Sequence, residues 1–364
     1  MFAAIPLFAQ VGIDSHIDTA QRVLIDHADL TQRSTVGHVD LPRLREGGVN
    51  APFFALWVPT YYKGAEAVRR TLDLRDAMQA LFDAHPEQIA LALTAGDVER
   101  ITGSGKIAAI LTIEGGHQID DDLAVLRMYY RMGIRAMTIT HFRNTNWADS
   151  STDQPAHNGL TDFGKEVVRE MNRVGMIVDI SHVSDKTFSD VLAVTSKPVI
   201  ASHSSCRAIS DVPRNMTDDM IRALARNGGV VAINFGEGFL NPKDGELLKQ
   251  AIRNISYHEP SLTGKALDAY AADEAHRDMK PHPTAATLDD AVAHIDHAVK
   301  IAGIDHVGIG SDFDGISSPP KGLEDISKMP ALKAALRKKG YSEPDIRKIF
   351  GGNTLRVFRE VAGK

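Results

Sequence analysis

Several short apolar runs of this sequence end in side chains that bind metals or move protons. The first run, VGIDSHID at residues 11–18, carries His16 and Asp18 two residues apart. On an extended strand such residues point to the same face, so the imidazole and the carboxylate emerge side by side. Later runs close with further ionisable residues: Glu114, His141, His182, His203 and Asp312. Convergent imidazole and carboxylate groups are typical of a metal centre.

Each of these residues has a simpler explanation when it is taken alone. A lone histidine after an apolar run is usually a structural residue, and a terminal Asp or Glu usually caps a helix. Independent capping does not account for imidazoles and carboxylates at equivalent positions on so many runs. Burying that much charge without a metal is also costly. We therefore interpret the residues as one metal site.

The composition narrows the metal chemistry. A single cysteine, Cys206, stands against fifteen histidines, which excludes an intrachain disulfide and thiolate-rich zinc sites. Histidine with carboxylate suits zinc, and also manganese, iron or cobalt. Two metal ions need about six ligand contacts, a number that a bridging carboxylate reduces. Glu114, between the two groups of histidines, is the natural bridge.

The apolar runs alternate with segments of helical periodicity. Eight runs are predicted strands, at residues 11–18, 49–58, 107–115, 134–141, 176–182, 198–203, 229–235 and 306–315. Strands that alternate with helices pair in parallel, and eight such units predict an α/β fold, a (β/α)8 TIM barrel of the metal-dependent hydrolase type. A doubly wound open sheet is the second choice, but no G-x-G-x-x-G follows an early strand. Barrel active sites lie at the carboxyl ends of the strands, where the ionisable residues stand.

One segment interrupts this alternation. From Glu237 to about Thr287 the chain has scattered charges and no clear strand. Because a structureless loop of that length is uncommon in a compact domain, we expect a helical insertion at about residues 237–287, before the last strand. It would form a lid or wall over the barrel mouth. We otherwise expect one catalytic domain over residues 1–364.

The composition also limits the partners and the location. A net charge of −6 gives no basic footprint for nucleic acid or an anionic membrane surface, so small molecules are the expected partners. No stretch approaches the ~20 apolar residues of a membrane span, which indicates a soluble chain. The apolar opening MFAAIPLFAQ is either a signal-peptide remnant or the lead-in to the first strand, so cytoplasmic and exported locations both stay open. A homodimer is the commonest default for such enzymes.

The motifs around the ionisable residues resemble those of the membrane dipeptidase (renal dipeptidase) family of zinc peptidases. They run in the same order along nearly the whole chain: HID (16–18), IEGGH (113–117), TITHFRNTNWADS (138–150), DISHVSD (179–185), ASHSSCRAI (201–209), PRNMTDDMI (213–221) and GSDFDG (310–315). The resemblance implies an amidohydrolase-like barrel and a binuclear zinc dipeptidase acting on dipeptides with a free C-terminal carboxylate. Family substrates include dipeptides with a C-terminal D-residue, and some members open β-lactam rings.

The resemblance also implies two Zn²⁺ ions per chain and a ligand set for each. His16, Asp18 and Glu114 would hold one zinc ion. Glu114, His182 and His203 would hold the other, with Glu114 shared between them.

Three further roles follow from the resemblance. His141 would polarise the scissile carbonyl and stabilise the oxyanion. Arg214 would receive the C-terminal carboxylate of the substrate through a bidentate contact, for which the guanidinium geometry is suited. Asp312 would move a proton from the bridging water to the leaving amine. Asp314 is a weaker alternative to Asp312.

Departures from the family limit what is carried over. The residues IDTAQRVL (17–24) differ from the usual sequence, so the wall near the first strand is expected to be altered. Mammalian members are lipid-anchored and disulfide-linked, but this chain has one cysteine and ends in FREVAGK, so anchoring is not carried over. Substrate specificity is expected to differ in the insertion.

Two other functions are alternatives to the dipeptidase. The same metal scaffold hosts lactonases and deaminases, but a substrate without a carboxylate has no need of Arg214. A non-catalytic metal- or ligand-binding protein has no use for a proton shuttle such as Asp312. The dipeptidase is therefore the leading hypothesis.

Overall fold

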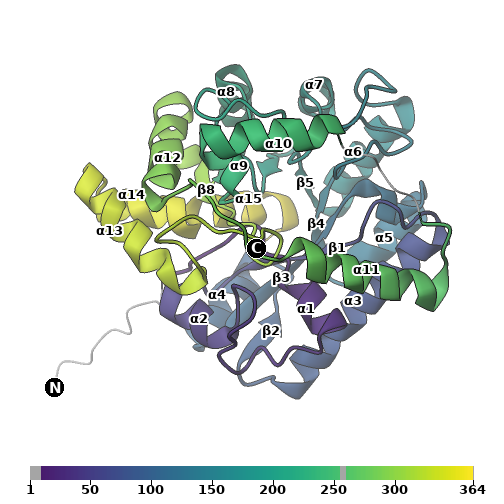
Figure 1. The fold of residues 1–364 in the computed structure, drawn as a ribbon, viewed down its shortest axis with the longest axis horizontal. Coiled ribbons are helices and arrows are strands. Elements are labelled where there is room, and N and C mark those ends of the chain that lie inside the picture. The colour runs from purple at the N-terminus through teal and green to yellow at the C-terminus, as the bar shows by residue number, and fades with distance from the viewer. Residues whose placement is uncertain (1–9, 255–259, 364) are drawn as a thin grey trace.

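The computed structural model of the protein describes residues 10–254 and 260–363. Its strands form one parallel sheet that curls into a barrel surrounded by helices (Figure 1). The strands are β1 (Phe53–Trp57), β2 (Ile89–Leu91), β3 (Ile107–Glu114), β4 (Ile134–Thr138), β5 (Ile177–Asp179), β6 (Ile200–Ala201), β7 (Val230–Ile233) and β8 (Val307–Ile309). Neighbours pair in the order β1-β3-β4-β5-β6-β7-β8. The α/β barrel predicted from the sequence is confirmed.

The sheet is closed by a segment that is not a regular strand. Residues 11–18, predicted as the first strand, form only isolated bridges, in which Ile17 pairs with Phe54 on one side and Phe313 on the other. Phe53 donates to the Asp14 carbonyl at 2.9 Å and accepts from the Ile17 N–H at 3.0 Å. A regular parallel ladder joins such a residue to partners two apart, so one extra residue interrupts the ladder here. We call residues 11–18 and 310–315 the seam.

Two other details differ from the prediction. Strand β2 lies outside the predicted ranges and pairs with the first residues of β3, off the main path of the sheet. The strands β6 and β8 are also much shorter than the predicted runs at 198–203 and 306–315. The predicted site residues of these runs, His203 and Asp312, lie beyond the ends of β6 and β8, in the loops at the barrel mouth.

The helices cover the outside of the barrel and connect its strands (Figure 1). They are α1 (Thr19–Ile25), α2 (Leu41–Gly47), α3 (Ala65–Ala84), α4 (Ala95–Gly103), α5 (Leu123–Arg131), α6 (Asp162–Val174), α7 (Asp185–Val194), α8 (Asp218–Arg226), α9 (Glu237–Leu240), α10 (Pro242–Asn254), α11 (Gly264–Asp278), α12 (Leu288–Ala302), α13 (Met329–Lys339), α14 (Glu343–Arg347) and α15 (Asn353–Ala362). Polar caps begin many of them; Thr287 and Asp290, for example, form a capping box on α12. Within the described ranges, no helix has both the length and the apolar character needed to cross a membrane.

The helical insertion expected before the last strand is present and comprises α9, α10 and α11. Helix α11 is held against the barrel by two tyrosines of the loop after β1. The Tyr61 hydroxyl donates to Glu274 at 2.7 Å, and the Tyr62 hydroxyl donates to Asp268 at 2.9 Å. These bonds join the insertion to the loop that follows β1.

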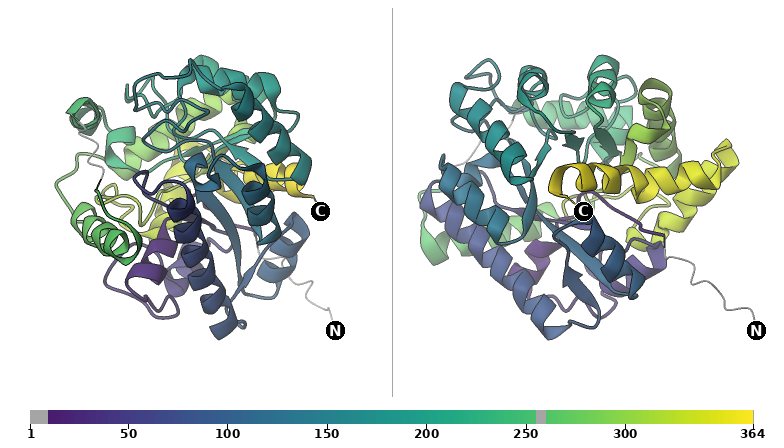
Figure 2. Two further views of the ribbon diagram at one scale, coloured as in Figure 1. Left: turned by 90° about the vertical axis from the view of Figure 1, so that its right-hand side faces the viewer. Right: turned by 180° about the vertical axis from the view of Figure 1, so that it is seen from behind.

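Helix α15 closes one end of the barrel, as the view from behind in Figure 2 shows. Its residues Val357 and Phe358 are buried in one cluster with Phe53, Ile177 and Val230 from the first residues of three strands. The Phe53 and Phe358 rings pack edge to face with centroids 6.1 Å apart. Apolar side chains therefore fill the end of the barrel where the strands begin, and the polar site lies at the other end.

Candidate functional site

Four of the predicted site residues follow consecutive strands of the sheet. Glu114 ends β3, and His141, His182 and His203 follow β4, β5 and β6; all four are buried. Glu114 Oε1 lies 3.0 Å from His182 Nε2, 3.3 Å from His203 Nε2 and 3.7 Å from His141 Nε2. The Nε2 atoms of His182 and His203 are 2.9 Å apart. Ring nitrogens from three strands thus converge on one carboxylate oxygen.

The remaining acidic and histidine residues of the site come from the seam. His16 Nε2 lies 3.4 Å from Glu114 Oε2 and 3.5 Å from Asp18 Oδ2. Asp312 joins them, because His16, Asp18 and Asp312 each offer a ligand atom and these atoms lie within 4.8 Å of one another. Glu114 therefore presents Oε1 to the histidines after β4–β6 and Oε2 to His16.

The surroundings of this cluster disfavour the ionised form of its carboxyl groups. Burial raises the pKa of Glu114, and the charge of Asp312 adds to the effect. Burial also raises the pKa of Asp18, and it raises the pKa of Asp312 to about 7 with a further contribution from Asp18. A bound cation reverses this trend, because it favours the ionised carboxylates.

The histidines of the cluster divide into two kinds. Burial disfavours the charged form of His16, but Glu114 and Asp18 outweigh it and raise the pKa of His16 well above its usual range. Burial, together with nearby cationic groups such as Arg214, lowers the pKa of His182 and His203 well below the usual range. A neutral imidazole keeps the lone pair that binds a metal ion.

Unpartnered atoms and the donor set both fit metal ions. His16 Nε2 and Asp18 Oδ1 are buried, yet neither hydrogen-bonds to any residue that the structure describes. Buried polar atoms normally have partners, so these atoms require an explanation. Three triads have ligand atoms close enough to share an ion: His16, Glu114 and His203; Glu114, His141 and His182; and His16, Asp18 and Asp312. Nitrogen and oxygen ligands without sulfur suit zinc and related divalent metals.

Two supporting residues were not predicted from the sequence. The Ser202 hydroxyl donates to Asp179 Oδ2 at 2.6 Å and lies 2.8 Å from His203 Nδ1 and 3.5 Å from His16 Nδ1. Since the Ser202 proton goes to Asp179, the Ser202 oxygen accepts from the Nδ1–H of His203. The lone pair of His203 is thereby placed on Nε2, toward Glu114. The motifs carried this signal, because Asp179 opens DISH and Ser202 directly precedes His203.

Arg214 is buried beside the histidines. Its Nη2 donates to the His203 carbonyl at 3.1 Å, and its guanidinium lies 5.2 Å from the centre of the Phe239 ring. Burial lowers the pKa of Arg214 to about 10. Its Nε is buried and hydrogen-bonds to no residue in the described ranges. A buried guanidinium with an unused donor is suited to binding an anion.

The two acidic residues of the GSDFDG motif have different surroundings. Asp312 faces the cluster, and its Oδ2 accepts from Asn234 Nδ2 at 2.9 Å. Asn234, directly after β7, was not predicted from the sequence. Asp314 instead accepts from the Thr19 hydroxyl at 2.7 Å and from Arg22 at 3.1 Å. Asp314 is thus occupied by structural partners, which favours Asp312 for the proposed proton transfer.

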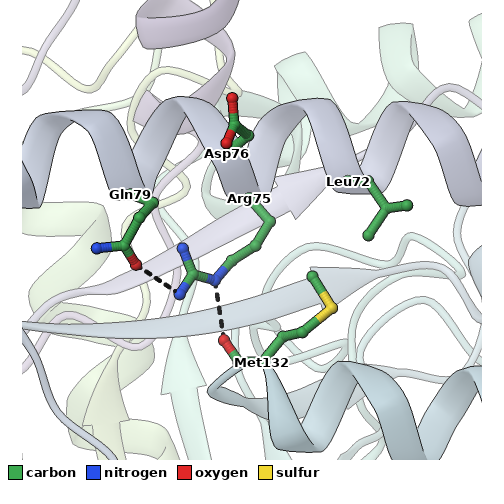
Figure 3. Close-up of a pocket in the computed structure, with 5 residues that line it drawn as sticks. All are labelled: Leu72, Arg75, Asp76, Gln79 and Met132. Atoms are coloured by element: carbon green, nitrogen blue, oxygen red, sulfur yellow. Dashed lines mark hydrogen bonds between the residues drawn. The ribbon is translucent and has the colours of Figure 1, made fainter.

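A separate hollow lies between α3 and the end of α5, and none of its lining residues belongs to this cluster (Figure 3). It has a volume of about 350 Å³ and is lined by Leu72, Arg75, Asp76, Gln79 and Met132. Arg75 donates to the Met132 carbonyl at 2.9 Å and to Gln79 at 2.8 Å. The hydrogen bonds of Arg75 thus join α3 to the end of α5 and are already satisfied within the protein. We therefore place the functional site at the barrel mouth.

Comparison with known proteins identifies the family of this chain. The model of the family "Membrane dipeptidase (Peptidase family M19)" matches residues 7–363. Dipeptidase tcpJ of Claviceps purpurea (strain 20.1) is 37% identical over 331 residues, which cover 88% of this chain and 68% of that protein. Dipeptidase verJ of Clonostachys rogersoniana is 36% identical over 332 residues, which cover 88% of this chain and 75% of that protein.

Two solved structures have the same fold. A metallo peptidase from Rhodobacter sphaeroides, liganded with a phosphinate mimic of the dipeptide L-Ala-D-Ala, has a TM-score of 0.80 and 26% identity, covering 96% of this chain and 99% of that chain. The probable dipeptidase PvdM from Pseudomonas aeruginosa has a TM-score of 0.80 and 27% identity, covering 97% of this chain and 95% of that chain. The family match spans nearly the whole chain, and the two dipeptidases exceed 30% identity. The chain therefore belongs to the membrane dipeptidase family of metallopeptidases.

Proposed function

We propose that this protein is a binuclear zinc dipeptidase that hydrolyses dipeptides with a free C-terminal carboxylate. The observation that carries the proposal is the position of Glu114. One of its oxygens lies 3.0 Å and 3.3 Å from His182 and His203, and the other lies 3.4 Å from His16. A carboxylate with metal-binding groups at both oxygens is suited to bridging two ions.

The ligand sets follow from these contacts. His16, Asp18 and Glu114 would hold one zinc ion, and Glu114, His182 and His203 would hold the other. When bound, paired zinc ions lower the pKa of a water molecule toward neutrality and polarise an oxygen of the substrate.

The other residues of the cluster bind the substrate and move its protons. Arg214 receives the C-terminal carboxylate, because its guanidinium is buried and keeps an unused donor. His141 donates a hydrogen bond to the oxygen of the scissile carbonyl as negative charge develops there. Asp312 takes a proton from the attacking water and gives it to the amide nitrogen as the C–N bond breaks. The products are two free amino acids.

The same residues argue against the two alternative functions. A lactone or amine substrate without a carboxylate leaves the buried Arg214 without an anion, which is unfavourable. A protein that only binds metals or ligands makes no use of Asp312, whose carboxylate is oriented by Asn234 toward the cluster.

The substrate range is proposed to include C-terminal D-residues. The solved relative from Rhodobacter sphaeroides binds a phosphinate mimic of L-Ala-D-Ala. A carboxylate that is held by one guanidinium fixes the end of the substrate, but it does not restrict the Cα of the last residue to the L or the D configuration. A β-lactam that carries a carboxylate beside its strained amide presents the same two features, so it belongs in the substrate panel.

The test is hydrolysis of a small panel with zinc-loaded and metal-stripped protein. The panel comprises L-Ala-L-Ala, L-Ala-D-Ala, the C-terminal amide of each, and one carboxylate-bearing β-lactam. We expect cleavage of the free dipeptides only when zinc is present, and little or no cleavage of the amides. Equal cleavage of amides and free dipeptides would contradict the role of Arg214. No cleavage of any dipeptide with two zinc ions bound would contradict the dipeptidase itself.

A further inference from the structure

Trp57 contacts His141 through the ring nitrogen that does not face Glu114. Trp57 ends β1 and lies opposite Glu114 in the β1–β3 ladder. Its indole Nε1–H donates to His141 Nδ1 at 3.4 Å, and the ring centroids are 5.5 Å apart. The backbone oxygen of Trp57 accepts a hydrogen bond from Gln21. These bonds tie Trp57 both to the start of α1 and to the imidazole.

The bond from Trp57 determines where His141 carries its proton. An indole N–H only donates, so His141 Nδ1 must offer a lone pair to accept from it. A neutral imidazole has one protonated nitrogen, and in His141 that nitrogen is then Nε2. His141 Nε2 lies 3.7 Å from Glu114 Oε1. The N–H of His141 therefore points toward the centre of the cluster.

His203 is held in the opposite state. Its Nδ1 lies 2.8 Å from the Ser202 oxygen, and the Ser202 proton goes to Asp179 at 2.6 Å. His203 Nδ1 is therefore the donor, and His203 Nε2 offers its lone pair to the cluster. The two histidines face the same glutamate, but one presents a donor and the other presents a metal ligand.

We propose that Trp57 is a positioning residue that holds His141 as its Nε2–H tautomer. His141 then acts as a hydrogen-bond donor and does not ligate a metal, although Glu114, His141 and His182 lie close enough together to share an ion. The tautomer is inferred from contacts within this chain alone. The donor role toward a substrate carbonyl rests on the proposed dipeptidase function.

Histidine ¹⁵N spectra of the zinc-loaded enzyme test the tautomer directly. The two ring nitrogens of His141 are assigned by their loss in His141→Gln. We expect a protonated Nε2 and an unprotonated Nδ1 in the wild-type protein. A protonated Nδ1, or coordination of Nε2 by zinc, would overturn the proposal. This readout requires no turnover, so its result is independent of the dipeptide assay.

Substitution of each tryptophan tests the cause. Trp57→Phe keeps an aromatic ring but removes the N–H, so the His141 signals should move toward a mixture of tautomers. Trp147→Phe is the matched control, because Trp147 is the only other tryptophan of the chain and its buried Nε1 hydrogen-bonds to no described residue. It should leave the His141 signals unchanged. Unaltered His141 signals in Trp57→Phe would contradict the proposal.

Kinetics of the same variants test the consequence. Removing a hydrogen-bond donor to a developing oxyanion lowers kcat about 10²- to 10³-fold. A misplaced proton on an intact imidazole ring should lower kcat by less. We expect Trp57→Phe to lower kcat about tenfold, with KM and the zinc content unchanged. A fall in zinc content, or a rise in KM without a change in kcat, would show that Trp57 acts on the metal or on substrate binding and would overturn the proposal.

Discussion

The two sides of the barrel mouth are built in different ways. On one side, Glu114, His141, His182 and His203 follow the consecutive strands β3 to β6, and a parallel ladder joins these strands. On the other side, the seam supplies His16, Asp18 and Asp312 through isolated bridges at Ile17. We call the first group, Glu114, His141, His182 and His203, the ladder side. Strand register places the residues of the ladder side, whereas close packing of irregular backbone places those of the seam.

The packing of the seam leaves little room for change. Asp312 has a positive φ of 64°, a conformation that few non-glycine residues adopt and that His182, with a φ of 68°, shares on the ladder side. A Cβ on Gly310 would meet the Ser202 carbonyl at 1.7 Å, so the chain approaches β6 there too closely for any side chain. A single methyl group added to the seam should therefore disturb that half of the site alone, whereas a change at Glu114, which contacts residues of both halves, should disturb both.

The largest effect is expected from Glu114→Ala. Glu114 is the residue that joins the two sides, so its removal should release both metal ions and lower kcat/KM on the order of 10³-fold or more. Metal content by mass spectrometry and dipeptide turnover measure the two losses. Glu87→Ala, at an exposed glutamate, is the control and should behave as wild type. Turnover that persists in Glu114→Ala with both metals bound would contradict the bridge.

Gly315→Ala should affect the seam alone. Its new Cβ would lie 2.1 Å from Asp18 Oδ2 and 2.6 Å from Asp312 Oδ1, so both carboxylates must move. A displacement of this size costs about 10²-fold in activity. We expect the ion held by His16 and Asp18 to be lost and the other ion to be retained.

Gly103→Ala is the matched control for this substitution, because a Cβ at Gly103 meets nothing within 4 Å. It should keep both ions and full activity. If Gly315→Ala also binds two zinc ions and turns over dipeptides normally, the seam is more adaptable than its packing implies.

Ser202→Ala should weaken both sides to a smaller degree. Ser202 lies beside His203 of the ladder side and His16 of the seam, and it connects them to Asp179. Loss of such an outer hydrogen bond typically lowers metal affinity about 10- to 100-fold. Competition with a chelator measures the affinity, and the exposed Ser189→Ala serves as control. An unchanged affinity would show that Ser202 does not orient these ligands.

The smallest effect concerns His294, a buried histidine outside the mouth. Its Nδ1 accepts from the Cys206 N–H and its Nε2 donates to the Leu240 carbonyl, both at 3.0 Å. Burial lowers the pKa of His294 from 6.5 to about 4. Its neutral form is therefore favoured in the folded chain, while the unfolded chain takes up a proton as the pH falls below 6.5. The contribution of His294 to the folding stability is therefore fully present above pH 6.5 and is lost as the pH falls toward 4.

Urea unfolding of the metal-free protein at pH 7.5 and pH 5.5 measures this contribution. The wild type should lose about 1 kcal/mol of unfolding free energy through His294 over this interval. In His294→Gln the loss between the two pH values should be smaller by that amount. An equal loss in both proteins would show that His294 does not titrate as its buried position implies.

The sequence was sufficient to predict the ladder side. Carboxyl ends of parallel strands meet at one end of a barrel, so Glu114, His182 and His203 could be brought together from their positions after apolar runs. The seam was predicted less well. His16 and Asp18 do face the cluster, but the segment that carries them is interrupted by an extra residue, which alternation of side chains does not reveal.

The supporting residues could not be derived from spacing. Ser202 and Asn234 are common polar residues, and their roles depend on which atoms lie within hydrogen-bond distance after folding. Trp57 reads as an ordinary apolar strand residue until its N–H is seen to face His141. Arg214, a residue in a loop, was identified only through the family resemblance.

The most direct test of the shared site is anomalous diffraction at the zinc edge from crystals of the zinc-loaded protein. We predict two peaks, one on each side of Glu114. The first should be bound by His16 and Asp18, and the second by His182 and His203. A single peak, or two peaks that do not share Glu114, would contradict the binuclear site on which the proposed function rests.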